Sequence, residues 1–241
     1  MADTREKTAG IIGGMGPEAT VDLMQRIIRL TPAMDDRDHI RCLVDNNPKI
    51  PSRIKAIIEG QGEDPGPCMA AMAQGLEAAG ADFLAIACNT AHFYYETVRA
   101  SVTIPVIHMV EAVLAHIREH HPNCHKIGIL ASPAIRITRL YENILGPAGI
   151  KILYPDPKDQ DRLFQVIRKV KAGDLGPEIQ DQYDRVCGHL EKKGVALAVV
   201  ACTELSALGR ESGKTASLAC LDAAEILAKR IVDVAKGVKP L

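Results

Sequence analysis

Phe83-Leu-Ala-Ile-Ala-Cys88-Asn-Thr90 and Leu197-Ala-Val-Val-Ala-Cys202-Thr-Glu204 place a cysteine at the same point, after an apolar run and before a polar, helix-starting turn. Continuous apolar runs of this length are typical of strands buried on both faces of a parallel sheet. Thiolates at helix N-termini have depressed pKa values, because N–H groups and the helix dipole stabilise the anion. One such cysteine could be core filler, but two at matching positions favour a paired acid/base role.

A second similarity indicates an internal repeat. The stretch from Thr8 to Thr20 aligns with the stretch from Lys126 to Thr138, and Gly10 then matches Gly128 at an offset of 128 − 10 = 118. The cysteines repeat at 202 − 88 = 114. Near-equal offsets for two strand-loop-helix segments predict two similar halves. In such halves ligands bind beyond the carboxyl ends of the strands, where both cysteines are expected to lie.

Short apolar runs alternate with helix-length amphipathic stretches along the whole chain, which predicts an α/β fold. The expected strands are Ala9–Gly13, Ile40–Asp45, Phe83–Ala87, Val106–Ile107, Lys126–Leu130, Lys151–Tyr154, Ala196–Ala201 and Ser217–Leu221. The expected helices include Ala19–Leu30, Cys68–Ala79, Met109–His120, Asp159–Val170, Gly176–Lys192 and Asp222–Lys236.

The composition excludes several classes of partner. With 29 basic and 30 acidic residues, the chain has no excess charge to hold nucleic acid or an anionic membrane. Its apolar runs are far shorter than the roughly 20 residues that span a bilayer, and no signal pattern opens the chain, so we expect a cytoplasmic protein. The seven scattered cysteines are expected to be reduced thiols. The stretch from His120 to His125 could bind a metal adventitiously, but it is interpreted as an exposed loop, so no metal site is expected.

The glycine-rich segment from Gly13 to Thr20 follows an expected strand and opens an expected helix. It is neither a dinucleotide-binding fingerprint, because Pro17 and Glu18 occupy the approach, nor a phosphate-binding P-loop, because Gly-Lys-Ser/Thr is missing. Its backbone N–H groups and the helix N-terminus could bind a carboxylate. The alternative is a plain tight turn.

Three more residues have two interpretations each. Arg53 follows Asn47-Pro-Lys-Ile-Pro-Ser52 and could clamp a carboxylate or be a solvated charge at a helix start. Lys171 ends the helix from Asp159, where a cation meets the C-terminal dipole, so its default interpretation is structural. His92 could be a general base, but it could equally face a neighbouring helix.

Five motifs in this order resemble the aspartate/glutamate racemase family, and specifically its aspartate racemase branch. They are Gly13-Gly-Met-Gly-Pro-Glu-Ala-Thr20, Asp38-His39-Ile40, Asn47-Pro-Lys-Ile-Pro51, Ala87-Cys-Asn-Thr-Ala-His92 and Ala201-Cys-Thr-Glu-Leu205. The resemblance covers nearly the whole chain. It implies two flavodoxin-like three-layer α/β/α domains with parallel sheets and an active site in the cleft between them. The expected domains are 1–114 with a returning C-terminal helix at 222–241, and 115–221.

The resemblance also implies a homodimer that interconverts L- and D-aspartate, or glutamate, without a cofactor. In this pattern Cys88 and Cys202 are the acid/base pair. Further positions match residues that hold the α-carboxylate (Asn89, Thr90, Thr203), that hold the side-chain carboxylate (Arg53, Lys171) or that close the site (Met15, Gly16).

One position departs from the family pattern. Ser52 stands where an Asp commonly precedes the arginine, whereas Glu204 follows the second cysteine. The two thiols are therefore expected to be unequally activated. Related alternatives are hydantoin racemisation and maleate isomerisation, and a protein of another class would bind a carboxylate without catalysis. Arg53 and Lys171 favour a substrate with a second carboxylate.

Overall fold

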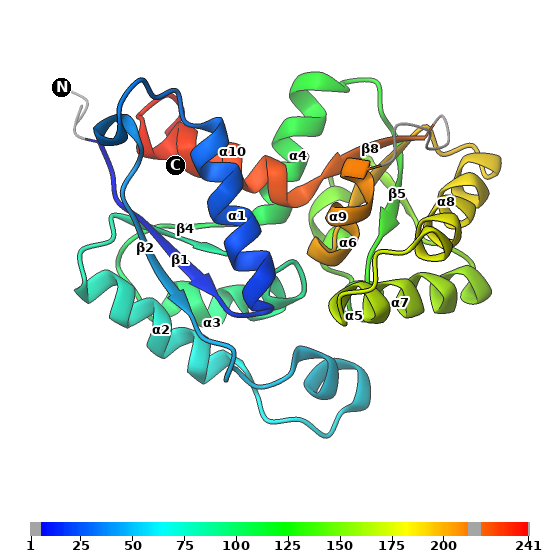
Figure 1. Cartoon of the computed structure of the whole chain (residues 1–241), viewed down its shortest axis with the longest axis horizontal. Helices are drawn as coiled ribbons and strands as arrows, with labels where there is room; N and C mark the ends of the chain where they lie inside the picture. Colours follow the sequence, from blue (N-terminus) through cyan, green and yellow to red (C-terminus); the bar gives the residue numbers. More distant parts are fainter. Residues whose placement is uncertain (1–5, 212–217, 241) are drawn as a thin grey trace. The chain divides into compact units, whose positions relative to one another are not determined.

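The computed structural model describes residues 6–211 and 218–240 and divides into two compact units (Figure 1). The first unit comprises the chain up to Ala112 and from Ala224 onward, and the second is Val113–Ala223. Each unit holds a four-stranded parallel sheet, in the order β2-β1-β3-β4 in the first and β6-β5-β7-β8 in the second. This shared order is that of doubly wound α/β folds, so the expected fold class and its repeat are confirmed.

The strands lie close to their expected positions. The first sheet is formed by β1 (Ala9–Gly13), β2 (Cys42–Asn46), β3 (Phe83–Ile86) and β4 (Val106–Ile107). The second is formed by β5 (Lys126–Leu130), β6 (Lys151–Leu153), β7 (Leu197–Val200) and β8 (Ala219–Asp222). Every residue of β1, β3 and β7 is buried, as continuous apolar runs require. Ser217, the expected start of the last strand, lies outside the described residues.

The helices of the first unit cover its sheet. They are α1 (Pro17–Leu30), α2 (Gly66–Ala78), α3 (Tyr95–Ala100) and α10 (Ala223–Ala235), with short turns η1 (Asp36–Asp38), η2 (Lys55–Glu59) and η3 (Thr90–Tyr94). The C-terminal helix α10 lies beside α1, because Arg26 Nη1 and Arg29 Nη2 donate to Glu225 at 2.9 and 2.7 Å (Figure 1). The C-terminal segment is thereby attached to the first unit.

The second unit contains α5 (Pro133–Thr138), α6 (Leu140–Leu145), α7 (Pro157–Lys171), α8 (Pro177–Lys192) and α9 (Thr203–Glu211). The helix α4 (Met109–His120) includes the boundary between the units. The core of the second unit contains apolar side chains of α7, α8, α9 and the sheet, among them Leu163, Val186 and Leu205. The buried Asp159 accepts from Arg162 and His189, both at 2.5 Å, and so ties α7 to α8.

The register places both cysteines at equivalent points. In the first sheet the N–H of Ala87 donates to the carbonyl of Ile12 in β1 at 2.9 Å, and Cys88 follows. In the second sheet the N–H of Ala201 donates to the carbonyl of Leu130 in β5, also at 2.9 Å, and Cys202 follows. Each cysteine therefore lies just beyond the carboxyl end of its strand, beside the neighbouring central strand.

Candidate active site

A short 3-10 turn, and not an α-helix, follows Cys88. The half-buried Cys88 is followed by η3, and α3 starts only at Tyr95. Asn89 precedes η3 with φ −59° and ψ −54°, and its side chain makes no capping hydrogen bond to the turn. These αR backbone angles do not aim the side chain at the N–H groups of the next turn.

His92 is the buried side chain that contacts this turn. Its ring, 2% exposed, places Nδ1 2.8 Å from the Cys88 carbonyl, and the backbone N–H of Met109 donates to Nε2 at 3.1 Å. Since Nε2 accepts, the neutral ring carries its proton on Nδ1 and donates it to Cys88.

Burial, and then the nearby His108, lower the pKa of His92 to about 3. Both nitrogens are engaged in hydrogen bonds, and the lowered pKa makes the ring a weak base, so this geometry does not fit the general-base interpretation. His92 instead faces α4, the alternative that the sequence left open.

Cys202 has a carboxylate beside its sulfur. Its Sγ donates to Glu204 Oε2 at 3.1 Å, and the hydroxyl of Thr203 donates to the same oxygen at 3.2 Å. The Cys202 carbonyl accepts from the N–H of Leu205 at 3.1 Å. The turn thus leads directly into α9. A carboxylate at this distance favours the protonated thiol, since a thiolate there would be repelled.

The glycine-rich turn after β1 lies beside the Cys88 turn, because β1 and β3 are neighbours. Thr20 holds it: its hydroxyl accepts from the N–H of Gly14 at 2.9 Å and contacts the Gly16 carbonyl at 3.2 Å. Gly14 has φ +90°, and a Cβ there would lie 2.1 Å from the Asn47 carbonyl oxygen. A side chain at Gly16 would meet nothing within 4 Å.

Met15, expected to close the site, is 5% exposed and belongs to the apolar core of the first unit. In this structure its side chain is part of the packing. Gly16 precedes α1 as its N-cap, with no side chain to compete for the open space beside it. The backbone at Gly16 is therefore the part of this loop that a ligand could approach.

Arg53 lies in the segment that follows β2. Its Nη1 donates to the Pro51 carbonyl at 2.7 Å, which fixes the direction of the guanidinium. Among the described residues no carboxylate lies within ion-pair distance of Arg53. Ser52 accepts a hydrogen bond from the N–H of Lys55 at 3.3 Å and so caps the turn that Arg53 begins.

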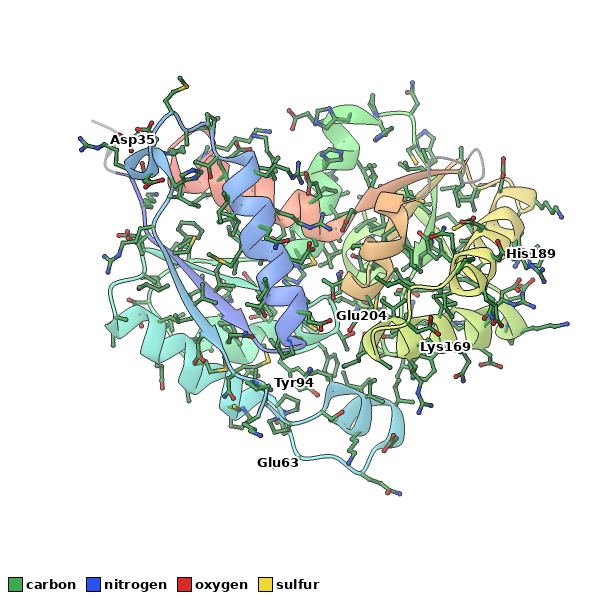
Figure 2. All side chains as sticks on the ribbon, viewed as in Figure 1. Asp35, Glu63, Tyr94, Lys169, His189 and Glu204 are labelled. Carbon is green, nitrogen blue, oxygen red and sulfur yellow. The ribbon has the colours of Figure 1, made fainter. Side chains whose placement is uncertain are left out.

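Tyr94, labelled in Figure 2, is the last residue of η3. Burial and the negative charge of Asp64 raise the pKa of Tyr94, while the positive charge of Arg53 lowers it. Arg53 therefore lies close enough to η3 to affect the ionisation of Tyr94.

Lys171 is the exposed last residue of α7. Helix α7 packs against α9, which begins right after Cys202. Figure 2 labels Lys169 of the same last turn and Glu204 of α9. The structure describes no side-chain contact between Lys171 and the Cys202 turn.

The structure therefore brings Cys88, Asn89, Thr90 and His92 together in the first unit, and Cys202, Thr203 and Glu204 in the second. The sequence interpretation missed Thr20 and Met109. Thr20 was visible only as the end of the glycine motif, and Met109 enters through its backbone N–H, which no side-chain pattern reveals. Within residues 6–211 and 218–240, no three metal-ligating side chains gather, and no helix is long and apolar enough to cross a membrane.

Comparison with known proteins places this geometry in a family. The model of the family described as Asp/Glu/Hydantoin racemase matches residues 12–231. Among curated proteins, the broad specificity amino-acid racemase RacX of Bacillus subtilis is 27% identical over 216 residues, which are 83% of this chain and 86% of that protein.

Two solved structures have the same fold. Picrophilus torridus aspartate racemase matches with a TM-score of 0.83 and 29% identity, over 95% of this chain and 94% of that one. An aspartate racemase homologue from Pyrococcus horikoshii OT3 matches with a TM-score of 0.76 and 22% identity, over 95% and 99% of the two chains. The sequence match and the shared pair of four-stranded sheets lead to one conclusion: the chain belongs to the Asp/Glu/Hydantoin racemase family of isomerases.

Proposed function

We propose that this protein interconverts L- and D-aspartate, and glutamate as a second substrate, by a two-base reaction of Cys88 and Cys202 without a cofactor. The observation that carries the proposal is the pair of thiols at equivalent strand ends of two sheets with the same order. Inversion at a carbon needs one group to take the proton from one face and another to return it on the opposite face.

In the proposed reaction, one cysteine thiolate takes the α-proton and becomes a thiol. The electron pair left on Cα is delocalised into the carboxylate as an enediolate. The other thiol gives its proton to the opposite face and becomes the thiolate, so protons and charge balance, and the roles exchange in the reverse direction. Since the α-proton of an amino acid is very weakly acidic, donors around the carboxylate must stabilise the developing charge.

The contact between Cys202 and Glu204 supports different protonation states for the two cysteines in the resting enzyme. A thiol that donates to a carboxylate at 3.1 Å is favoured in its protonated form, which suits the proton donor. When Cys202 must act as the base, Glu204 is placed to accept its proton. We infer that Cys88 is the thiolate in the resting enzyme.

The substrate's carboxylates are assigned by charge. Asn89, Thr90 and Thr203 supply polar groups for the α-carboxylate next to the thiols, and the Gly16 backbone supplies an approach at the N-terminus of α1. Arg53 and Lys171 are proposed to hold the side-chain carboxylate. Support for Arg53 comes from its fixed, partly buried guanidinium, which no described carboxylate neutralises. The active form is proposed to be a homodimer.

A second candidate is broad-specificity amino-acid racemisation. The likeness to RacX over 83% of this chain favours it. The two candidates differ in Arg53, because an enzyme that depends on a second carboxylate should lose affinity for aspartate, but not for alanine, when Arg53 is removed. For Arg53→Ala the dicarboxylate proposal expects a rise of about 10- to 100-fold in the KM for aspartate.

The deciding experiment incubates the wild-type chain with single L-amino acids in deuterated water and follows α-deuterium and product chirality. We expect D-aspartate that carries deuterium. Cys88→Ala and Cys202→Ala should each reduce racemisation by about 10³-fold or more, since neither thiol replaces the other at its own face. Wild-type rates in either variant would contradict the two-base mechanism. Ligand binding with no deuterium incorporation would instead indicate a carboxylate-binding protein.

A further inference from the structure

The starting observation is how the carbonyl of each candidate catalytic cysteine is held. The carbonyl of Cys202 accepts a hydrogen bond from the backbone N–H of Leu205, as is usual at the start of a helix. At Cys88 the ring of His92 reaches the carbonyl at 2.8 Å. Applying the offset of 114 to His92 gives 92 + 114 = 206, and Ser206 is a buried residue whose hydroxyl has no partner among the described atoms. Within the described residues, Ser206 therefore makes no contact that corresponds to the one between His92 and Cys88.

We propose that His92 is a positioning residue that fixes Cys88 by tying its carbonyl to the first residue of α4; this inference rests on the proposed role of Cys88 as an acid/base. The ring spans two segments far apart in sequence, donating to Cys88 and accepting from Met109, 17 residues later. It touches no substrate in this role and acts only through the backbone of Cys88.

The geometry explains why the chain uses a histidine. Cys88 lies just before the 3-10 turn η3, whose first hydrogen bond runs from the N–H of His92 to the carbonyl of Asn89 at 3.0 Å. The Cys88 carbonyl is therefore outside the turn, and the ring of His92 supplies the donor that sets its direction. A neutral imidazole provides a donor and an acceptor on opposite sides of one rigid ring. His92 also stacks on Tyr95 with the ring centroids 6.5 Å apart, and His108 lies 5.0 Å away, which leaves the ring little room to turn.

Rigid placement matters for this chemistry. Misplacing a reacting group by about 1 Å can cost about 100-fold in rate, even when the fold is intact. A lost His92–Cys88 contact should therefore act on kcat more than on KM, because Cys88 moves relative to the α-carbon while the carboxylate anchors remain.

Two substitutions separate the halves of the contact. In His92→Asn the amide nitrogen can replace Nδ1 as the donor to Cys88, while the acceptor for Met109 is lost. In His92→Gln the amide oxygen can replace Nε2 as the acceptor, while the donor to Cys88 is lost. Ser206→Ala is the matched control at the equivalent buried position of the other half, where the described structure has no hydrogen bond to remove.

The test measures kcat and KM of aspartate racemisation, alkylation of Cys88 and Cys202 by iodoacetamide with peptide mass spectrometry, and thermal unfolding of each full-length variant. We expect His92→Gln to lower kcat by about 10- to 100-fold with KM changed less than about twofold, and His92→Asn to stay within about threefold of wild type. The alkylation rate should change at Cys88 and not at Cys202 in His92→Gln. Ser206→Ala should behave as wild type.

Equal losses of kcat and of thermal stability in His92→Asn and His92→Gln would overturn the proposal, because they would assign His92 to packing alone. An unchanged alkylation rate of Cys88 in His92→Gln would also overturn it. Absence of racemisation in the wild-type protein would refute the proposed function, whereas the alkylation comparison would still decide whether His92 positions Cys88.

Discussion

The Cys88 turn and the Cys202 turn occupy the same place in two sheets of the same order, yet different contacts hold them. At Cys88 the polar contact reaches the backbone carbonyl, from a buried neutral histidine. At Cys202 it reaches the sulfur, from a carboxylate. The two similar units thus provide two equivalent strand ends. His92, four residues after Cys88, and Glu204, two residues after Cys202, give the two cysteines different surroundings.

The glycine-rich turn extends this comparison. After β1 the chain needs Gly14 at φ +90°, whereas the position matched by the offset of 118 is Ser132, with φ −65° just before α5. The first unit therefore has the tighter strand-to-helix connection. Inequality between the halves involves the backbone as well as the side chains next to the thiols.

The largest expected effect concerns this tighter turn. Gly14→Ala places a Cβ 2.1 Å from the Asn47 carbonyl oxygen at a positive φ, so we expect the free energy of unfolding to fall by about 3 kcal/mol or more. Gly16→Ala is the matched control, because nothing lies within 4 Å of its Cβ, and its stability should change by less than about 1 kcal/mol. Urea unfolding checks both. Equal stability of the two variants would mean that the turn relaxes easily.

The carboxylate at the second turn is expected to come next in size. Glu204→Gln keeps the shape of the side chain and removes its charge, so kcat/KM should fall by about 10- to 100-fold, or about 1.4 to 2.7 kcal/mol, in both directions of aspartate racemisation. Cys202 should then react faster with iodoacetamide at pH 7, by about tenfold, because the charge that opposes its thiolate is gone.

The reactivity of Cys88 serves as the internal control in the same Glu204→Gln sample. An equal increase in the alkylation rate of both cysteines would mean that the charge of Glu204 does not act on Cys202 in particular. A slower reaction at Cys202 would mean that Glu204 acts mainly as its base.

Acid should destabilise the first unit through the buried His92 and the half-buried His108. Burial lowers the pKa of His92 to about 3 and that of His108 to about 4, against an ordinary value of 6.5. Between these values the unfolded chain binds more protons than the folded one, so this stability is present above pH 6.5 and is lost as the pH falls. At pH 5 the loss from His92 should be about 2 kcal/mol.

Urea unfolding at pH 7.5 and pH 5 measures this loss of stability. His92→Gln should remove the part of the loss that comes from protonation of His92. A variant with the same pH dependence as wild type would place the acid sensitivity elsewhere. The neighbours of His92 that face it are His108 and Tyr95, so the remaining dependence should come mainly from His108.

Much of the fold could be predicted from the sequence, because parallel strands buried on both faces are continuous apolar runs. The bounds of β1, β4 and β5 match their expected residues, and the paired cysteines were recognisable from their repeat. The short turn η3, the helices α5 and α6, and the core position of Met15 were not expected. A 3-10 turn and a buried methionine depend on tertiary packing, and the tautomer of His92 depends on Met109, 17 residues away.

The smallest effect is expected for a substitution at Ser52, where the family pattern commonly has Asp. It tests whether the Cys88 turn needs a nearby carboxylate. Ser52 already caps the helical turn that begins at Arg53, because its hydroxyl accepts from the N–H of Lys55. Asp can accept the same hydrogen bond, so Ser52→Asp should change the free energy of unfolding by less than about 0.5 kcal/mol. With His92 holding the Cys88 backbone, kcat should change by less than about threefold. A tenfold rise in kcat would instead show that Cys88 lacks a charge partner, and the two turns would then require the same kind of group at the thiol.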